Sequence, residues 1–570
     1  MQQAPSPDLI DRLAAGVRAY MLIAIIAVLG VAPGLFSMPP LDRDESRYAQ
    51  ATAQMLETGD FVRIAVQEDP RHKKPIGIHW LQAASVATAS SVEAREIWAY
   101  RLPSLVGTVL TALAAFWAGI ALVGRRAAFV GASLLAASLL VTSEGMIGKT
   151  DAVLCGLTTL TLAALARLRT RPAGTSGNGL ALLAWAGFGA GILIKGPITP
   201  VVAISALAAL ALWERRIDWM APLTRPWGPL MALAFTAPWF IAIGIVTERQ
   251  FFIDAILDDL APKISGGGEH PFAPPGLHSL LLLLLSFPFV VGLAPGARLA
   301  WRAVRTDSTN ASQAGFRFLI AWAAPTFLLF EVAPTKLAHY PLPTYPALAL
   351  IAAAGLLAML REAWPRTRSV AVGAFALSAA GVVGVCAVLA ALSTTEAVAA
   401  QNRAVITTSV GLVIVAGWAL ALARAKTAAL IIGLCVGGGL VAAAVAREGF
   451  ATRASAVLVS RAADDALREA GLHPREDRAA AGLWIVGYRE PSLVFATETR
   501  ARLAGGATAG AEAPIGAAMI VEDRERSAME AGLKARGLQF APKGAPVAGT
   551  NYSNGDAVRL QPGVVAPAGP

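Results

Sequence analysis

Long apolar runs recur along most of this chain and alternate with short polar connections. Each run is roughly 18 to 24 residues long, the length that an α-helix needs to cross the hydrocarbon core of a bilayer. No small-residue cleavage site follows the first run, so we expect it to be retained as a span. The pattern predicts a polytopic α-helical membrane protein with about 13 transmembrane helices. The runs lie near residues 20–36, 102–123, 127–143, 150–166, 179–194, 197–213, 227–247, 277–297, 316–333, 341–360, 370–393, 404–423 and 427–446.

Arginines in the connections predict the orientation of these helices. They gather in every second connection, for example at Arg125–Arg126, Arg167–Arg171, Arg215–Arg216 and Arg361–Arg368, and short basic loops stay in the cytoplasm. This places the N-terminus in the cytoplasm of a bacterial inner membrane and residues 447–570 in the periplasm. Topology then accounts for most of the net charge of +10, so we expect membrane lipids and no nucleic acid as partners.

Composition agrees with a membrane protein. Of 570 residues, 55% are hydrophobic and 15% are charged, which is too apolar for an ordinary water-soluble globule. The three cysteines, Cys155, Cys386 and Cys435, all fall inside predicted spans. We therefore expect no disulfide framework and assign the cysteines to packing.

Two polar segments of the first external connection, residues 37–100, carry candidate chemistry. In LDRDESRYAQATAQM, residues 44–57 have helical periodicity and predict an amphipathic helix on the membrane surface. Asp44 and Glu45 begin this helix, where acidic residues commonly act as caps, and spacing alone favours that structural interpretation over a catalytic one. In PRHKKPIGIHW, Lys73 and Lys74 suit either lipid headgroups or a substrate phosphate.

Asp151 and Lys195 shift this balance toward catalysis. Each lies at the end of a predicted span, on the same side as Asp44 and Lys74, where an ionised side chain is costly unless it is paired or hydrated. Carboxylates beside lysines combine acid–base chemistry with phosphate binding, which favours an enzyme. The alternative from another class, a lipid or sugar transporter or flippase, should show internal repeats with broken helices, and no convincing repeat is visible.

As a set, these motifs resemble the GT-C membrane glycosyltransferases. The set comprises DESRY after the first span, Lys74–Pro75, Asp151, Lys195–Gly196 and TKLAHYPLPTYPALAL at 335–350. The resemblance covers residues 20–446, and its closest branch contains the lipid A aminoarabinose transferase and the bacterial relatives of protein O-mannosyltransferases. It implies a GT-C-like transmembrane glycosyltransferase domain, which we place at residues 1–446.

The resemblance also implies roles for individual residues. Asp44 matches the family's acidic residue at the reaction centre, with Glu45 beside it and Asp151 as a second carboxylate. Binding of the donor phosphate is implied for Arg47, Lys74, Lys195, Tyr340 and Lys336, and further contacts for Lys73, His270 and His339. The aminoarabinose enzyme has Glu where this chain has Lys73. A metal site built on His270 would lack that ligand, so no cofactor is certain and a divalent metal stays open.

The donor implied by the resemblance is a polyprenyl-phosphate sugar, used in an inverting displacement of the EC 2.4 class. Asp44 would activate the acceptor hydroxyl while cationic side chains stabilise the departing polyprenyl phosphate. No nucleotide-binding GxGxxG and no cytoplasmic DxD is found, in keeping with a lipid-linked donor. The implied acceptor is lipid A or another glycolipid at the periplasmic face, and a secreted protein is the alternative.

Two further segments have a different character. Residues 248–276 combine an amphipathic stretch with glycines and prolines, which is typical of either a lid or a plain surface linker. After residue 446, helical stretches alternate with short strands at 483–488, 517–523 and 538–542. This predicts a small periplasmic α/β domain over residues 447–570 with a structural or acceptor-docking role.

Overall fold

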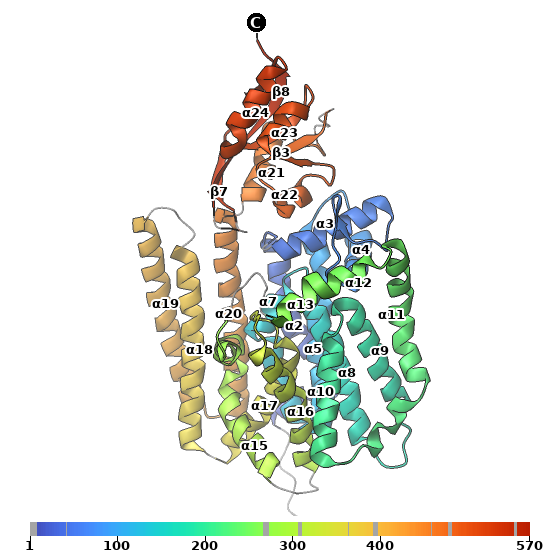
Figure 1. Cartoon of the computed structure of the whole chain (residues 1–570). Coiled ribbons are helices and arrows are strands. Elements are labelled where there is room, and N and C mark those ends of the chain that lie inside the picture. The colour runs from blue at the N-terminus through green and yellow to red at the C-terminus, as the bar shows by residue number, and fades with distance from the viewer. Residues whose placement is uncertain are drawn as a thin grey trace, which may run out of the picture.

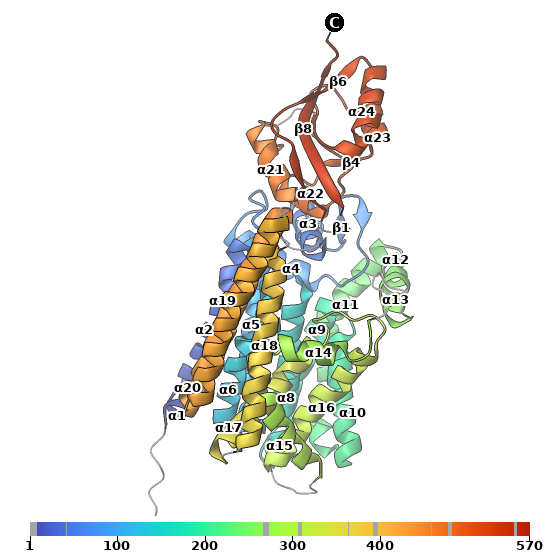
Figure 2. The ribbon, with the colours of Figure 1, turned by 90° about the vertical axis from the view of Figure 1, so that its left-hand side faces the viewer.

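The computed structural model of the chain describes residues 8–40, 43–265, 273–305, 311–362, 364–391, 397–457, 459–476, 481–551, 554 and 556–569. A bundle of long helices forms the main body, and a smaller α/β domain stands on one end of it (Figure 1). Figure 2 places α1 (Leu9–Leu13) at the opposite end of the bundle from this domain. The first and last described elements therefore lie at opposite ends of the molecule.

Ten helices of the described residues are long and apolar enough to cross a membrane. They are α2 (Gly16–Ser37), α5 (Ile97–Leu122), α8 (Thr150–Thr170), α9 (Asn178–Lys195), α11 (Trp227–Val246), α16 (Ala311–Val332), α17 (Tyr345–Arg361), α18 (Pro365–Ala391), α19 (Ala397–Arg424) and α20 (Ala428–Val457). Two bent combinations can each add one span. These are α6 (Arg125–Ala136) with α7 (Leu139–Gly145), and α14 (Leu277–Leu285) with η3 (Phe289–Gly292) and α15 (Leu293–Arg305).

This count of ten to twelve is slightly below the number predicted from the sequence. The remaining predicted run, residues 197–213, is α10 (Ile198–Glu214). With 17 residues it spans about 26 Å at the usual helical rise, a few ångströms less than a hydrocarbon core of about 30 Å. The polytopic helical architecture is confirmed, and the difference concerns the length of one helix.

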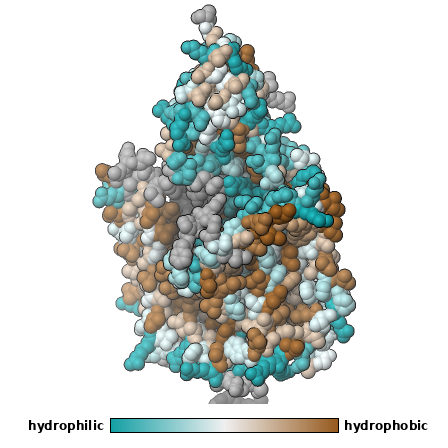
Figure 3. Space-filling view, in the orientation of Figure 1, coloured by the Kyte–Doolittle hydropathy of each residue, from teal (hydrophilic) through white to brown (hydrophobic). Residues whose placement is uncertain are grey.

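The surface of the bundle is apolar around its middle. Figure 3 shows a broad hydrophobic band, with hydrophilic residues along the rim of the bundle below it and over the C-terminal domain above it. Large apolar side chains such as Ile204, Leu212 and Val413 are exposed in this region of the chain. Such exposure is unfavourable in water and favourable against lipid, so the band marks the membrane-facing surface.

Short elements form a layer between the bundle and the domain. This layer holds α3 (Arg43–Thr58), α4 (Gly77–Ala89) and a small antiparallel hairpin of β1 (Ala65–Val66) and β2 (Asp69–Pro70). The helix predicted at 44–57 is α3. It does not lie open on a surface as predicted, because Tyr48 and Met55 are buried and so are the polar side chains of Gln50 and Thr52. The remaining short elements are α12 (Gln250–Asp254), η2 (Ala255–Leu260), α13 (Ala261–Ser265), η1 (Asp218–Thr224) and η4 (Leu342–Thr344).

The C-terminal domain is built on a six-stranded mixed sheet in the order β4-β3-β5-β8-β6, with β7 also paired to β8. β3 is parallel to β4 and β5, whereas β8 is antiparallel to β5, β6 and β7. The strands are β3 (Leu483–Val486), β4 (Arg502–Ala504), β5 (Ala518–Glu522), β6 (Leu538–Pro542), β7 (Val547–Thr550) and β8 (Ala557–Pro567). The helices are α21 (Val459–Glu469), α22 (Pro491–Ala496), α23 (Gly506–Glu512) and α24 (Asp523–Ala535). The predicted small α/β domain is thereby confirmed.

The domain rests on α3 through α22 and the turn that follows it. The Thr499 hydroxyl accepts hydrogen bonds from Gln50 Nε2 at 2.7 Å and from Arg95 Nη2 at 2.9 Å. The Phe495 ring packs edge-on against Tyr100, with their centroids 5.2 Å apart. The domain and α3, the helix that carries Asp44, are therefore in direct contact.

Candidate active site

Asp44 lies in the first turn of α3, at the end of the helix bundle on which the C-terminal domain stands. Its side chain is 59% exposed, and Arg71 Nη2 approaches its Oδ1 to 3.3 Å. Burial alone would raise the pKa of Asp44, but the positive charges of Arg71, Lys149 and Arg47 outweigh it and hold the pKa below its usual value. The carboxylate is therefore ionised and accessible at neutral pH.

Tyr48, one turn further along α3, fixes this helix to the bundle. Its buried ring packs with Val153 and Leu154 of α8 and with Ile194 of α9. The guanidinium of Arg71 lies over the same ring, 5.2 Å from its centroid. This packing brings the start of α3 down onto the ends of α8 and α9, where the second carboxylate lies.

Asp151 lies in the first turn of α8, within a cluster of buried charges. Lys195 Nζ, at the end of α9, donates to Asp151 Oδ1 at 2.6 Å, and Lys149 Nζ lies 3.9 Å from Oδ2. The Lys149 ammonium is also 3.2 Å from a carboxylate oxygen of Glu144. Lys149 therefore lies beside Asp151, and its positive charge also lowers the pKa of Asp44. Together with the packing of Tyr48 against α8 and α9, this brings both predicted carboxylates to one end of the bundle.

His339 completes this cluster from the connection before α17. Its Nε2 lies 3.6 Å from Asp151 Oδ1 and its Nδ1 lies 3.8 Å from Glu144 Oε1. Burial lowers the pKa of His339, although both carboxylates oppose that shift. Tyr340 follows, with its ring 5.4 Å from that of His339, and burial raises the pKa of its hydroxyl. The Tyr340 hydroxyl is therefore a neutral hydrogen-bond donor.

Lys74 forms a second group of charges with residues of the 248–276 connection. It pairs with Asp259, which also accepts from Lys263 Nζ at 2.5 Å. Burial, together with the charges of Lys263 and Lys195, lowers the pKa of Lys74 to about 7 despite the opposing effect of Asp259. Two lysines that share one carboxylate leave positive charge available for an anion.

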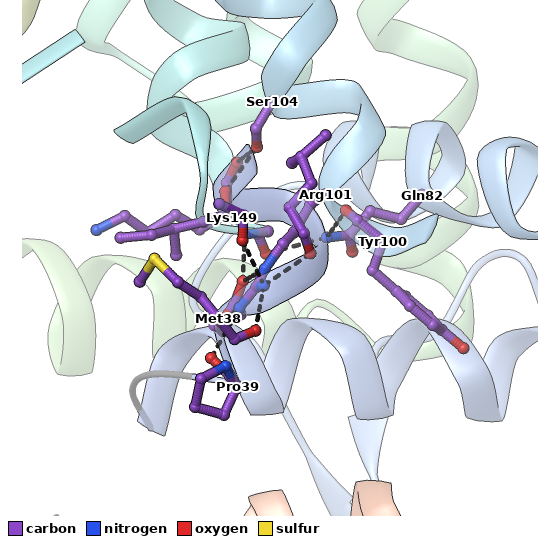
Figure 4. A network of polar contacts seen from close by, with 12 residues as sticks. Met38, Pro39, Gln82, Tyr100, Arg101, Ser104 and Lys149 are labelled. Carbon is purple, nitrogen blue, oxygen red and sulfur yellow. Dashed lines mark hydrogen bonds and ion pairs between the residues drawn. The ribbon is translucent and has the colours of Figure 1, made fainter. Parts of the chain in front are cut away.

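Glu45 has a different environment from its neighbour Asp44, because it belongs to the polar network of Arg101. Figure 4 shows Arg101 beside Met38 and Pro39 in this network. Its side chain is 0% exposed and forms a bidentate ion pair with Arg101, Nε to Oε1 at 2.7 Å and Nη2 to Oε2 at 2.8 Å. The backbone N–H of Gly148 donates to Oε1 at 2.6 Å. Arg101 also donates to the carbonyls of Met38 and Pro39, at 2.6 and 2.9 Å.

This network corrects the predicted catalytic role of Glu45. A fully buried carboxylate engaged by a guanidinium and a backbone amide cannot meet a substrate without breaking that pair, which is costly. The contacts instead join the end of α2, the start of α3, α5 and the turn before α8. Glu45 therefore positions Asp44 relative to Lys149 and Asp151.

The other predicted site residues fall in three groups. Lys336 donates from Nζ to the carbonyls of Ala273 and Ala333, at 3.0 and 2.8 Å. These hydrogen bonds link the connection before α14 to the one after α16, and they do not indicate a contact with the sugar donor. Arg47 acts on Asp44, and Lys73 is exposed beside Lys74. His270 lies outside the described residues. Among the residues that are described, no three His, Cys, Asp or Glu side chains are grouped to hold a metal ion.

Several charged residues of the site were not selected from the sequence. Arg71 precedes the lysine pair in PRHKKP, and Glu144 and Lys149 precede Asp151 in the same connection. Asp259 and Lys263 have the i, i+4 spacing of a helical ion pair. Their proximity to recognised motifs was the available signal. The pairs of Arg71 with Asp44 and of Asp259 with Lys74 join residues that are far apart in the chain, so spacing does not indicate them.

Known proteins resemble this chain in sequence and in fold. Residues 20–253 match the profile of the dolichyl-phosphate-mannose-protein mannosyltransferase family. The undecaprenyl phosphate-alpha-4-amino-4-deoxy-L-arabinose arabinosyl transferase of Aeromonas salmonicida is 30% identical over 410 residues, which cover 68% of this chain and 69% of that protein. The enzyme of the same name from Pectobacterium atrosepticum is 26% identical over 364 residues, which cover 62% of each chain.

The fold is similar to that of ArnT from Cupriavidus metallidurans. The crystal structure of its apo state aligns with a TM-score of 0.74 and 19% identity over 96% of this chain and 98% of that chain. The structure of the same protein bound to undecaprenyl phosphate aligns with a TM-score of 0.73 and 18% identity over 95% and 97%. Because sequence identity to the Aeromonas salmonicida relative reaches 30% across more than two thirds of both proteins, this chain belongs to the aminoarabinose transferase family of GT-C membrane glycosyltransferases.

Proposed function

We propose that this protein transfers a sugar from a polyprenyl-phosphate donor to a glycolipid acceptor, with inversion at the anomeric carbon. The observation that carries the proposal is the group of charges around Asp151, which Lys195 contacts at 2.6 Å and Lys149 at 3.9 Å. Tyr48 packs the helix that carries Asp44 against the same ends of α8 and α9. This arrangement supplies a base and cations for a phosphate leaving group at one membrane surface. Since the chain belongs to a transferase family, the transporter alternative is set aside.

Asp44 is the proposed base. It is the more exposed of the two carboxylates and is ionised at neutral pH, so it can accept the proton of an acceptor hydroxyl as that oxygen attacks the anomeric carbon. Asp151 is less suited to that step because Lys195 and Lys149 already neutralise it. We assign Asp151 to holding these two lysines in place.

Lys74 and Lys195 are the proposed contacts of the donor phosphate. As the bond between the anomeric carbon and the phosphate oxygen breaks, negative charge grows on the departing polyprenyl phosphate, and fixed ammonium groups stabilise that charge. Arg47 and Tyr340 supply further donors nearby. No metal contributes a step in this scheme.

The reaction would take place in the periplasm, with the N-terminus in the cytoplasm. The support is the set of arginine-rich connections at the end of the bundle opposite to Asp44. We place the division between the transmembrane domain and the C-terminal domain near residue 446, and propose that the latter supports α3 and docks the acceptor. The donor to test first is undecaprenyl phosphate-linked 4-amino-4-deoxy-L-arabinose, because the relatives are named for it.

Transfer by the purified full-length chain tests this function. The protein is incubated with that donor and with lipid A, and products are followed by mass spectrometry, with Asp44→Asn as the control enzyme. We expect lipid A to gain one sugar in the wild-type reaction and not in the control. Modification of secreted proteins instead would favour a protein acceptor, and transfer to neither class would overturn the proposed function.

A further inference from the structure

A crevice of about 1400 Å³ opens at the end of the bundle away from the C-terminal domain. The crevice and the candidate active site lie at opposite ends of helix α5. Arg101, near the start of α5, belongs to the Glu45 network, and Leu122, at its end, lines the crevice. The crevice and the carboxylates therefore lie on opposite membrane surfaces. The proposed reaction makes no use of it.

Helix ends from distant parts of the sequence surround the crevice. They belong to α5, α6, α15, α16, α17, α18 and the connection between α19 and α20. Figure 2 shows α15, α17 and the start of α18 gathered at this end. The crevice is thus an intramolecular feature at the level where a bilayer presents its headgroups.

Basic side chains dominate its rim. The described residues that line it include Arg125, Arg126, Arg361, Arg368 and Lys426, against the single acidic residue Glu362. Arg126 pairs with Asp8 and Asp11, and Arg361 lies 3.3 Å from Glu362. The charges of these two arginines are therefore offset.

Three other cations carry the excess charge. Arg125 and Lys426 are exposed, and neither forms an ion pair with a carboxylate of the described residues. Arg368 is held at the rim by hydrogen bonds to the carbonyls of Ala423 and Ala425, at 3.0 and 2.7 Å. A carbonyl bond orients this guanidinium without cancelling its charge.

The walls beneath this rim are apolar. Leu299, Phe316, Leu357 and Trp364 line them. The Arg298 guanidinium lies over the Trp364 ring, 4.0 Å from its centroid. A basic rim above apolar walls matches an amphiphile with an anionic head, whose acyl chains meet the walls while its phosphate meets the cations.

We infer that this crevice binds an anionic phospholipid of the surrounding leaflet. The rule that basic loops stay on one side of a membrane accounts for arginines in each connection. It does not require three separate connections, between α5 and α6, between α17 and α18, and between α19 and α20, to place basic side chains around one amphipathic crevice, whereas lipid binding does. The site is separate from the donor and acceptor sites and independent of the proposed reaction.

Lipid titration of the purified full-length protein, followed by native mass spectrometry, tests this inference. The probes are phosphatidylglycerol and phosphatidylcholine with identical acyl chains. We expect phosphatidylglycerol to bind more tightly than phosphatidylcholine. The Arg125→Gln/Lys426→Gln variant should bind phosphatidylglycerol about 30-fold more weakly. Each basic group near an anionic surface strengthens binding by about fivefold, and this variant removes two of them.

Arg215→Gln/Arg216→Gln is the matched control, because these two arginines are exposed at the same membrane surface but do not line the crevice. It should retain wild-type affinity. Equal affinity for the two lipids, or an equal loss in the control variant, would overturn the inference. Displacement of the lipid by inorganic phosphate at similar concentration would also overturn it, since the site would then recognise free phosphate.

Discussion

Two adjacent carboxylates at the start of α3 serve different purposes because their surroundings differ. Asp44 is largely exposed and faces Arg71, whereas Glu45 is enclosed with Arg101. Helical geometry turns neighbouring residues about 100° apart, so one side chain reaches the site and the next reaches the bundle. The proposed base thus lies next to the residue that anchors its helix to the bundle.

Asp44→Asn should abolish most turnover while leaving the fold intact. Asparagine has nearly the same shape, and the exposed ion pair with Arg71 contributes at most about 1 kcal/mol. Loss of a positioned base typically lowers the rate by ~10²–10⁴. Steady-state transfer assays and thermal unfolding of the same preparation measure both quantities.

The matched comparison is Glu45→Gln, one residue away. Removing one partner of a buried ion pair costs about 3–5 kcal/mol, so we expect lower thermal stability and yield for this variant. If a folded Asp44→Asn protein keeps more than about a tenth of wild-type turnover, far above the loss expected for a missing base, Asp44 is not the base. Asp151→Asn is then the variant to examine.

Donor binding should depend on pH through Lys74. Because its pKa is lowered to about 7, the Lys74 side chain is fully protonated only well below that pH and loses its positive charge as pH rises through it. The phosphodiester of the donor keeps its charge throughout, so affinity should fall between about pH 6 and 9. Lys74→Arg should flatten this profile, because a guanidinium stays charged. Calorimetric titrations at several pH values measure the effect, and parallel profiles for both proteins would contradict it.

At the scale of elements, α3 is held from two directions. The Glu45–Arg101 network fixes its start to the bundle, and the turn after α22 contacts its middle through Gln50. Arg95 connects these parts, since it donates to Gln50 Oε1 at 2.9 Å and also to Thr499. The C-terminal domain therefore helps to hold the helix that carries Asp44.

Thr499→Val should loosen this contact. Valine keeps the shape but removes the hydroxyl that accepts from Gln50 and Arg95, and unsatisfied buried donors cost about 1–3 kcal/mol. We expect faster amide hydrogen exchange in residues 43–58 and slower transfer. Thr508→Val, at an exposed position on α23, should change neither. Unchanged exchange in the Thr499 variant would show that the contact does not restrain α3.

At the scale of the whole molecule, the proposed topology can be tested with reporters. The proposed topology counts α10 and both bent combinations as spans, which makes thirteen between the N-terminus and the domain. A fusion after Arg171 should then report a cytoplasmic location, and a fusion after Phe450 a periplasmic one. Alkaline phosphatase and a fluorescent protein serve as complementary reporters. Both fusions on one side of the membrane would rule out this orientation.

Sequence patterns alone were sufficient for most of the helical bundle, but not for the bends of 56° and 110° inside the runs predicted at 127–143 and 277–297. A helix in contact with lipid needs a continuous apolar run. Each such run can be recognised from its own residues, as at 102–123 and 150–166. The same holds for α3, whose periodicity is a property of neighbouring residues. Motif order likewise indicated Asp44, Lys74, Asp151 and Lys195 as candidates.

The tertiary structure decided which of these charges meet. Glu45 pairs with Arg101, which is 56 residues away, and Lys74 with Asp259, which is 185 residues away. Such partners are selected by packing between helices and leave no periodic trace in the sequence. The burial of Glu45, the bonding of Lys336 to backbone carbonyls and the support of α3 by Thr499 follow from the folded arrangement alone, because electrostatic environment depends on distance in space and not along the chain.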